Sequence, residues 1–175
     1  MKKVLLHVCC GVCALYSIEK LKKEGYLIEG LFFNPNIYPE AEYSLRKEAA
    51  QEAANIGEIK IIESKYEPSL WVDVCGQYKD EAEGGIRCNL CYKLRLKKTF
   101  ERAKDLGFDF FTTTLTISPY KDSAVISKIG KAIGADLFLE IDFKKGDGFK
   151  KTMELAKKHN LYRQKYCGCI YSQRL

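Results

Sequence analysis

The chain lacks any apolar run long enough for a membrane span or a secretory signal. Its first apolar stretch, Val4–Leu6, is interrupted by His7, and no stretch approaches the roughly 18 apolar residues that a bilayer requires. Because of this absence, we expect no signal peptide and no membrane partner. We expect the protein to be cytoplasmic.

Several common catalytic motifs are also absent. The sequence contains no P-loop, no Gly-x-Gly-x-x-Gly, no His-Glu-x-x-His and no ordered Ser, His and Asp triad. Cysteines follow the first predicted strand, in the place where ATP-using tRNA-modifying enzymes carry a Ser-Gly-Gly-type phosphate loop. These absences argue against an ATP-dependent mechanism.

Repeats, low-complexity tracts and linkers are missing too, so nothing divides the chain. Its 175 residues are 46% hydrophobic and 30% charged, as in a soluble globular protein. We expect one domain over residues 1–175. Eight cysteines are too few for a disulfide scaffold of this length. In the cytoplasm, clustered thiols indicate metal binding or catalysis before structural disulfides.

Short apolar segments alternate with amphipathic segments along the chain. The predicted strands are 3–9, 27–34, 58–63, 109–114 and 136–141, and the clearest predicted helices are 39–56, 90–106 and 121–133. This order predicts an α/β fold with a mostly parallel, doubly wound sheet of about five strands and flanking helices. His7, Trp71 and the isolated Cys75 are expected in the core.

The other cysteines stand in three clusters far apart in the sequence: Cys9-Cys10 with Cys13, Cys88-x-x-Cys91 and Cys167-Gly-Cys169. Thiolates that a fold brings together bind a soft metal or exchange electrons as a dithiol. The clusters therefore indicate metal or redox chemistry.

The first cluster falls where the first strand passes into a helix. Ligands bind at the carboxyl ends of strands in open α/β sheets, and a helix N-terminus favours thiolates. Gly11 would let the backbone turn so that both Cys9 and Cys10 reach one metal, with Cys13 as a further candidate ligand. The alternative is that these cysteines are small buried hydrophobic residues.

The second and third clusters leave different alternatives open. Cys88 and Cys91 can chelate one zinc ion or hold two corners of an iron–sulfur cluster, and the absence of a second Cys-x-x-Cys favours iron–sulfur. A disulfide between Cys167 and Cys169 would close a small, strained ring that is easily reduced. We therefore favour a redox dithiol there, with metal ligation as the alternative.

Three polar stretches fall at predicted strand ends or beside cysteines. They contain Asn34, Asn36, Tyr38, Tyr43 and Arg46; Lys121 and Asp122; and Tyr162, Arg163 and Tyr166. Aromatic and cationic side chains together suit base stacking and phosphate contact.

Positive charge, +6 overall, is concentrated in two blocks next to cysteine clusters. Residues 87–104 contain seven Lys or Arg against Glu101, and residues 144–165 contain eight against two acids. These blocks could form a face that binds a polyanion, or they could be ordinary solvated helix faces.

The order of these motifs resembles the cobalamin-independent epoxyqueuosine reductases of the QueH type over nearly the whole chain. The matching motifs are Leu5-Leu6-His7-x-Cys9-Cys10-Gly11-x-Cys13; Phe33-Asn-Pro-Asn-Ile-x-Pro39 with Glu42-Tyr43-x-x-Arg46; Arg87-Cys-x-x-Cys91 with Arg95-Leu96; Thr113-Thr-Leu-x-Ile-Ser-Pro-x-Lys121; and Tyr162-Arg-Gln-x-Tyr-Cys-Gly-Cys169-x-Tyr171-Ser172. Val12 is a small departure, where the family more often has proline. The departure leaves the cysteines unaffected.

The resemblance implies an oxidoreductase that removes the epoxide oxygen of epoxyqueuosine at the wobble position of tRNA, the last step to queuosine. It implies an adenine-nucleotide-hydrolase-like (HUP-like) layout without the phosphate loop. It also implies a [4Fe–4S] cluster held by Cys9, Cys10, Cys88 and Cys91, and a redox-active pair at Cys167 and Cys169. An additional iron and an electron donor of unknown identity complete this expectation.

Other residues receive roles as hypotheses. Asp122, Lys121 and Tyr43 are unranked candidates for the proton donor, and the candidates for substrate binding are Asn34, Asn36, Arg46, Tyr162 and Arg163. The main alternative function is a zinc-stabilised tRNA-binding module without redox activity. A tRNA thiolation enzyme is disfavoured because this chain lacks the phosphate loop that such an enzyme needs. A general thiol oxidoreductase is disfavoured because no Cys-x-x-Cys follows the first predicted strand.

Overall fold

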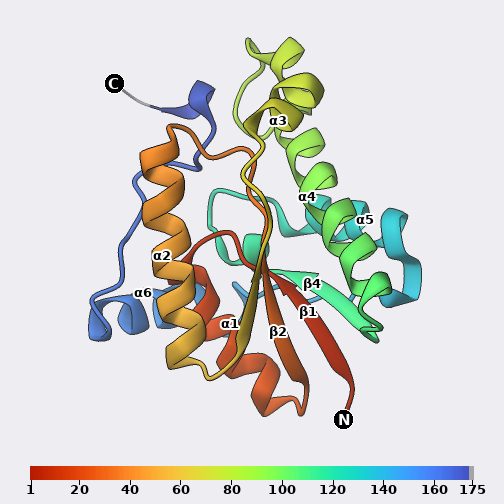
Figure 1. Ribbon diagram of the computed structural model, residues 1–175, viewed down its shortest axis with the longest axis vertical. Helices are drawn as coiled ribbons and strands as arrows, with labels where there is room; N and C mark the ends of the chain where they lie inside the picture. Colours follow the sequence, from red (N-terminus) through yellow and green to blue (C-terminus); the bar gives the residue numbers. More distant parts are fainter. Residues whose placement is uncertain (174–175) are drawn as a thin grey trace.

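A computed structural model describes residues 1–173 of the chain, and strands and helices alternate along it (Figure 1). The strands are β1 (Lys3–His7), β2 (Leu27–Phe32), β3 (Lys60–Glu63) and β4 (Phe110–Thr113). The α-helices are α1 (Gly11–Lys23), α2 (Glu40–Ile56), α3 (Pro68–Cys75), α4 (Ile86–Asp105), α5 (Ser123–Gly134) and α6 (Gly148–Lys158). Short 3-10 turns are η1 (Gly76–Tyr78), η2 (Thr114–Ile117), η3 (Ala135–Leu137) and η4 (Ile170–Ser172).

The four strands form one parallel sheet in the order β3-β2-β1-β4, which confirms the predicted α/β class. β1 lies inside the sheet, where Lys3 is in register with Leu27 of β2 and Val4 with Phe110 of β4. Its Val4, Leu5 and Leu6 are all fully buried, as expected for a strand covered on both faces.

The prediction of a fifth strand at residues 136–141 is wrong. Only Phe138 forms an isolated parallel bridge, to Phe111, and the preceding residues form η3. The reason is that backbone carbonyls of this segment accept hydrogen bonds from threonine side chains instead of from the backbone of a neighbouring strand. Thr112 Oγ1 donates to Leu139 O at 2.8 Å, and Thr116 Oγ1 donates to Ile141 O at 2.9 Å.

Helices cover both faces of the sheet (Figure 1). α1, α2 and α6 cover one face, over a core that includes Val4 and Leu6. α4 and α5 cover the other face, over a core that includes Leu5 and Phe111. Successive residues of β1 thus point to opposite cores, as the pleat requires. α6 was not predicted from the sequence.

Gly11 begins α1 and lies very close to α2. A Cβ at this position would stand 2.2 Å from the Ala49 carbonyl oxygen, so the two helices could not keep their separation with a larger residue. This contact fixes the start of α1, and with it the cysteines around that start, against the sheet. Within residues 1–173, no helix combines the length and apolar character needed to cross a bilayer.

Candidate cysteine-rich site

The predicted functional residues gather beyond the carboxyl ends of β1, β2 and β4. Cys9 and Cys10 follow β1, Asn34 and Asn36 follow β2, and the threonines of η2 follow β4. Ligands bind at this edge in open parallel sheets. The first turns of α4, which carry Cys88 and Cys91, and the segment after α6 contribute to the same part of the molecule.

The N-terminal cysteines form a compact sulfur group. The Sγ atoms of Cys9, Cys10 and Cys13 all lie within 4.8 Å of one another, and all three side chains are buried or half-buried. Sulfurs that share one tetrahedral ion, each at about 2.3 Å from it, stand about 4 Å apart. The spacing therefore fits ligands of a single soft metal ion.

Hydrogen bonds concentrate negative charge on Cys9. Thiol hydrogen bonds from Cys10 and Cys13 lower the pKa of Cys9, and Thr114 Oγ1, at 3.1 Å from Cys9 Sγ, contributes. For Cys10, the hydrogen bond with Cys13 lowers the pKa, whereas the hydrogen bond with Cys9 and burial raise it. The raising effects are larger together, and the pKa of Cys10 is raised to about 12. The same interactions and burial raise the pKa of Cys13. These interactions favour the thiolate at Cys9 and the protonated thiol at Cys10 and Cys13.

A second sulfur group lines a cavity between α3, α4 and the C-terminal segment. Its cysteines are Cys88, Cys91, Cys167 and Cys169. The sequence analysis grouped Cys88 and Cys91 with Cys9 and Cys10 as metal ligands, whereas in this cavity they lie beside Cys167 and Cys169. The interior is small, about 20 Å³, which is room for about one water molecule. Cys75, predicted to be in the core, is fully buried in the apolar cluster that contains Cys91 and Cys169.

The C-terminal pair is strongly asymmetric. Cys167 has its pKa lowered to about 5, chiefly by a hydrogen bond from Cys169 and also by Ser172, whose Oγ lies 2.8 Å from Cys167 Sγ. The same hydrogen bond and burial raise the pKa of Cys169. At neutral pH the pair is therefore a thiolate next to a thiol, which is the reactive form of a dithiol.

Several residues that line the cavity carry buried polar atoms without partners among the described residues. These atoms are Asn36 Oδ1, Trp71 Nε1, Arg87 Nε and Arg95 Nε. Buried polar groups are nearly always hydrogen-bonded in folded proteins. Three of the four atoms are N–H donors, so a group of negative character bound within reach of them would satisfy them. A thiolate-bound metal or iron–sulfur group fits both these donors and the soft sulfur ligands.

Arg95 lies near both sulfur groups. Its Nη2 donates to Asn34 Oδ1 at 2.9 Å, and its Nη1 lies 3.8 Å from Cys91 Sγ. Its positive charge also contributes to the lowered pKa of Cys9. Cys9 and Cys88 pack against the same apolar core, and Gln164 Nε2 lies 3.0 Å from Cys10 Sγ. The three cysteine-bearing segments therefore meet at one edge of the sheet.

The two groups are not one compact set of ligands in this arrangement. Within residues 1–173, only Cys9, Cys10 and Cys13 form a set of three possible ligands within 4.8 Å. Neither Cys88 nor Cys91 joins that set. Ligands on different irons of a cluster stand farther apart than ligands of one ion.

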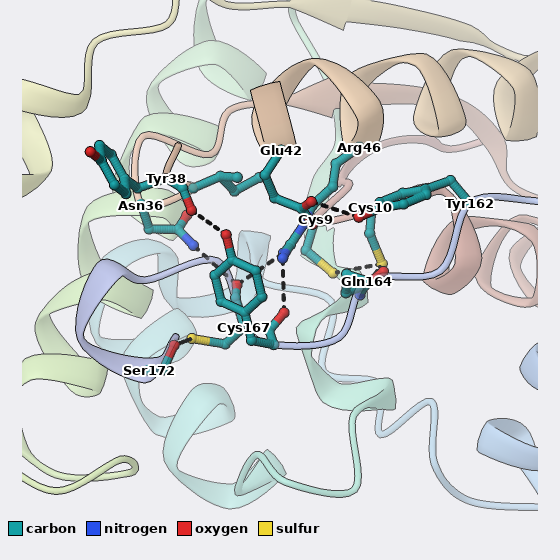
Figure 2. A network of polar contacts seen from close by, with 12 residues as sticks. Cys9, Cys10, Asn36, Tyr38, Glu42, Arg46, Tyr162, Gln164, Cys167 and Ser172 are labelled. Carbon is teal, nitrogen blue, oxygen red and sulfur yellow. Dashed lines mark hydrogen bonds and ion pairs between the residues drawn. The ribbon is translucent and has the colours of Figure 1, made fainter. Parts of the chain in front are cut away.

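A buried arginine fixes the C-terminal segment (Figure 2). Arg46 is 2% exposed and donates to the carbonyls of Tyr166 at 2.8 Å and Cys167 at 3.1 Å. Its Nε pairs with Glu42 at 2.7 Å, and Tyr162 Oη donates to the other oxygen of Glu42 at 2.6 Å. Arg46 and Tyr162, predicted to bind substrate, thus use their polar groups within the protein.

His7 and Asn34 belong to a second buried network. His7 Nδ1 lies 2.9 Å from Thr113 Oγ1, and its Nε2 lies 3.1 Å from Asn34 Oδ1. Burial, with a contribution from the charge of Arg95, lowers the pKa of His7 to about 4, so it is neutral at pH 7. The prediction that His7 is a hydrogen-bonded core residue is confirmed. Asn34, predicted to bind substrate, also donates to Val8 O at 2.9 Å.

The remaining predicted residues occupy different environments. Lys121 lines the cavity. Asp122 caps α5, because its Oδ1 accepts from Ala124 N at 2.8 Å. Tyr43 is buried against Tyr66, with ring centroids 4.1 Å apart, and burial raises its pKa. Arg163 is exposed.

The sequence analysis assigned no role to several residues that line or hold the site. Trp71 and Arg87 line the cavity, and Gln164 contacts Cys10. Arg87 Nη1 donates to the carbonyls of Tyr78, Lys79 and Glu81, which fixes the loop before α4. The signal available for Arg87 was its position directly before Cys88.

Comparisons with known proteins agree on one family. Residues 4–175 match the family model described as epoxyqueuosine reductase QueH. The epoxyqueuosine reductase QueH of Streptococcus pyogenes is 36% identical, over 98% of this chain and 71% of that protein. The one from Thermotoga maritima is also 36% identical, over 98% of this chain and 91% of that protein.

Solved structures with the same fold are more distant in sequence. A predicted tRNA methyltransferase subunit from Methanocaldococcus jannaschii has a TM-score of 0.59 and 16% identity, covering 90% of this chain and 76% of that one. The U34-tRNA thiolase NcsA from Methanococcus maripaludis, solved with its [4Fe–4S] cluster, has a TM-score of 0.54 and 16% identity. It covers 99% of this chain and 61% of that one, and the likeness supports the HUP-like layout.

Proposed function

The chain belongs to the QueH family of epoxyqueuosine reductases, and from this premise we propose how its site is used. The protein is an oxidoreductase that removes the epoxide oxygen of epoxyqueuosine in tRNA and leaves queuosine. We place the modified nucleoside at the wobble position. The reaction consumes two electrons and two protons, and the epoxide oxygen leaves as water.

The C-terminal dithiol is the proposed source of the electron pair. Oxidation of the Cys167 thiolate and the Cys169 thiol to a disulfide releases two electrons and one proton. A proton-donor residue supplies the second proton, which balances the conversion of the epoxide to an alkene and water. The observation that carries this proposal is that Cys167 and Cys169 line the same cavity, with Ser172 Oγ 2.8 Å from Cys167 Sγ; the lowered pKa of Cys167, about 5, favours its thiolate. An external reductant, of the thiol or low-potential electron carrier class, then restores the dithiol.

Cys9, Cys10, Cys88 and Cys91 are the proposed ligands of a [4Fe–4S] cluster, and Cys13 is a candidate for an additional iron. When bound, a cluster would supply single-electron transfer between the external reductant and the site. The soft donor set and the unpartnered N–H groups support this assignment. Since the interior of the cavity is only about 20 Å³, holding a cluster between the two sulfur groups requires the side chains around it to move apart.

Lys121 is the best placed of the three proton-donor candidates. It lines the cysteine cavity, whereas Asp122 uses its carboxylate to cap α5 and Tyr43 is buried against Tyr66. Among the substrate-binding candidates, Asn36 lines the cavity with a free Oδ1, and Arg163 is exposed. We assign Asn34, Arg46 and Tyr162 to holding the site in shape.

Anaerobic incubation with epoxyqueuosine-containing tRNA and a strong reductant tests the function, with nucleosides measured by mass. We expect the wild type to form queuosine and the Cys167→Ser, Cys169→Ser double variant to lose at least about 100-fold in rate, since the electron pair has no source. Cys75→Ala, a change at a cysteine outside the dithiol, is the control. Reduction at the wild-type rate by the double variant would remove the dithiol from the mechanism.

Metal content separates this function from the zinc-stabilised binding module. Anaerobically purified protein should be brown and contain iron and acid-labile sulfide. Colourless protein that contains only zinc and forms no queuosine would favour the binding module.

A further inference from the structure

The cavity is too small to admit a nucleotide. Its interior of about 20 Å³ holds about one water molecule, so the modified base must meet the sulfurs at the mouth of the cavity. The nucleotides on either side of that base then lie on the surrounding protein surface. This surface carries exposed tyrosines close to residues that line the cavity; Tyr171 packs against Trp71, whereas Tyr38 and Tyr120 lie beside the lining residues Asn36 and Lys121.

Tyr120 is the more exposed of the two, at 85%. It stands in a turn from Ser118 to Lys121, closed by Lys121 N donating to Ser118 O at 3.2 Å. Pro119 occupies the position that this kind of turn favours for proline. The turn presents the Tyr120 ring to solvent while the next residue, Lys121, lines the cavity.

A half-buried lysine makes this turn rigid. Lys144 Nζ donates to Ser118 O at 3.1 Å and to Lys121 O at 2.7 Å, so one ammonium group holds both ends of the turn. These bonds fix the backbone that carries Tyr120 and leave its ring open to solvent. A tyrosine on a fixed backbone has few rotatable bonds to order when a ligand stacks on its ring.

Tyr38 stands on a second fixed loop. Its backbone N–H donates to Gly168 O at 2.8 Å, and its carbonyl accepts from the Tyr166 hydroxyl. The Tyr38 side chain is 47% exposed, and Figure 2 shows its ring pointing away from the polar network. Asn36, two residues before it, lines the cavity. We call Tyr38 and Tyr120 the aromatic rim.

From these positions we infer that the aromatic rim stacks on the unpaired nucleotides that flank the modified base in the anticodon loop. The inference rests on the proposed function, because it takes tRNA as the substrate. Tyrosine rings stack on single-stranded bases of any sequence. Exposed Arg163 and Lys165 precede Cys167 and supply positive charge for the phosphates of the same nucleotides.

Binding of an anticodon stem–loop RNA to full-length Tyr120→Ala and Tyr38→Ala tests the inference. Each variant should weaken binding by about 5- to 150-fold, the range for loss of one stacked base. Tyr120→Phe keeps the ring and should bind within about twofold of wild type. A fully paired RNA duplex, which offers no unpaired base, should bind equally to all variants. Because both side chains are exposed, we expect every variant to keep the wild-type circular dichroism spectrum.

A fluorescent base analogue next to the modified position gives a direct readout. Its emission should be quenched on binding to wild type and to Tyr120→Phe, and less quenched on binding to Tyr120→Ala. Wild-type affinity and quenching in both alanine variants would overturn the inference, even if the wild type reduces epoxyqueuosine. If those variants bind RNA normally but are slow only with a protein electron donor, the rim serves that donor and the inference is wrong. Stacking without any reduction by wild type would instead count against the proposed function alone.

Discussion

Arg46 holds the segment that carries Cys167 and Cys169, and it shares one acceptor, the Cys167 carbonyl, with Asn36, whose Nδ2 donates to that oxygen at 3.4 Å. Arg46 is buried, pairs with Glu42 at 2.7 Å, and donates to the two carbonyls that precede Gly168. Gly168 has φ +107, and a Cβ there would lie 3.1 Å from Arg46 Nη1, so the segment is packed directly on the guanidinium. The geometry of Cys167 and Cys169 thus depends on a residue whose hydrogen bonds go to the backbone of this segment and not to its thiols.

Replacing Arg46 with Leu should destabilise the protein by about 3–5 kcal/mol, because it leaves the mostly buried Glu42 without its charged partner and the Tyr166 carbonyl without a donor. The free energy of unfolding in urea measures this effect. Lys47→Ala is the matched control, since the pair of Lys47 with Glu63, at 3.5 Å, is exposed and contributes about 0–1 kcal/mol. Equal losses in the two variants would contradict the role given to Arg46.

Cys167 should react as a thiolate far below the usual pH for cysteine. Because its pKa is lowered to about 5, its alkylation rate should be nearly constant from pH 8 to 6 and fall by half near pH 5. Mass spectrometry of the modified peptide measures the rate at each pH. Cys169, whose pKa is raised, should stay unmodified over this range.

Cys169→Ala supplies the control for that profile. The hydrogen bond from Cys169 is the first cause of the lowered pKa of Cys167, so its removal should move the midpoint upward, toward the ordinary value near 8.5. Ser172→Ala should move it less, since that hydrogen bond is a smaller cause. A midpoint near 8.5 in the wild type would show that Cys167 is an ordinary thiol.

At the scale of elements, the sequence predicted the structure best where periodicity is strong and local. β1, β2 and β4 lie within the predicted strands because their apolar residues bury against both helical layers. The wrong fifth strand had the same composition as a true strand. The carbonyls of Leu139 and Ile141 instead accept hydrogen bonds from the side chains of Thr112 and Thr116. These donors lie 27 and 25 residues away in the sequence, so no local pattern reveals them.

The same holds for the site: local sequence patterns identified its residues, but not the long-range contacts between them. The sequence gives each cysteine cluster and its chemical type, but not which clusters share a cavity. α4 and the C-terminal segment bring Cys88 and Cys91 beside Cys167 and Cys169, whereas Cys9, Cys10 and Cys13 form their own group. α6 escaped prediction because its lysines and its start at Gly148 look like a polar loop when its packing on α1 is unknown.

Across the whole molecule, positive charge is placed unevenly relative to the site. α4 begins at the cysteine cavity and extends away from it, and its Lys93 and Lys97 are exposed on one helical face within two turns of Cys91. The C-terminal end of α1 carries exposed Lys22 and Lys23 at the opposite edge of the sheet. A tRNA with its anticodon loop at the cavity would therefore meet the α4 lysines and not those of α1.

Binding of tRNA should weaken steeply as salt rises, since each phosphate contact releases bound counterions. Neutralising Lys93 and Lys97 to Gln should reduce the slope of log affinity against log salt by about 1.5, corresponding to about two lost contacts. The Lys22→Gln, Lys23→Gln variant removes the same charge from the far edge and should keep the wild-type slope. A wild-type affinity that does not change between low and moderate salt would contradict phosphate binding altogether. Equal slopes for the two double variants would instead mean that α4 is a solvated face and that the tRNA approaches the cavity from another side.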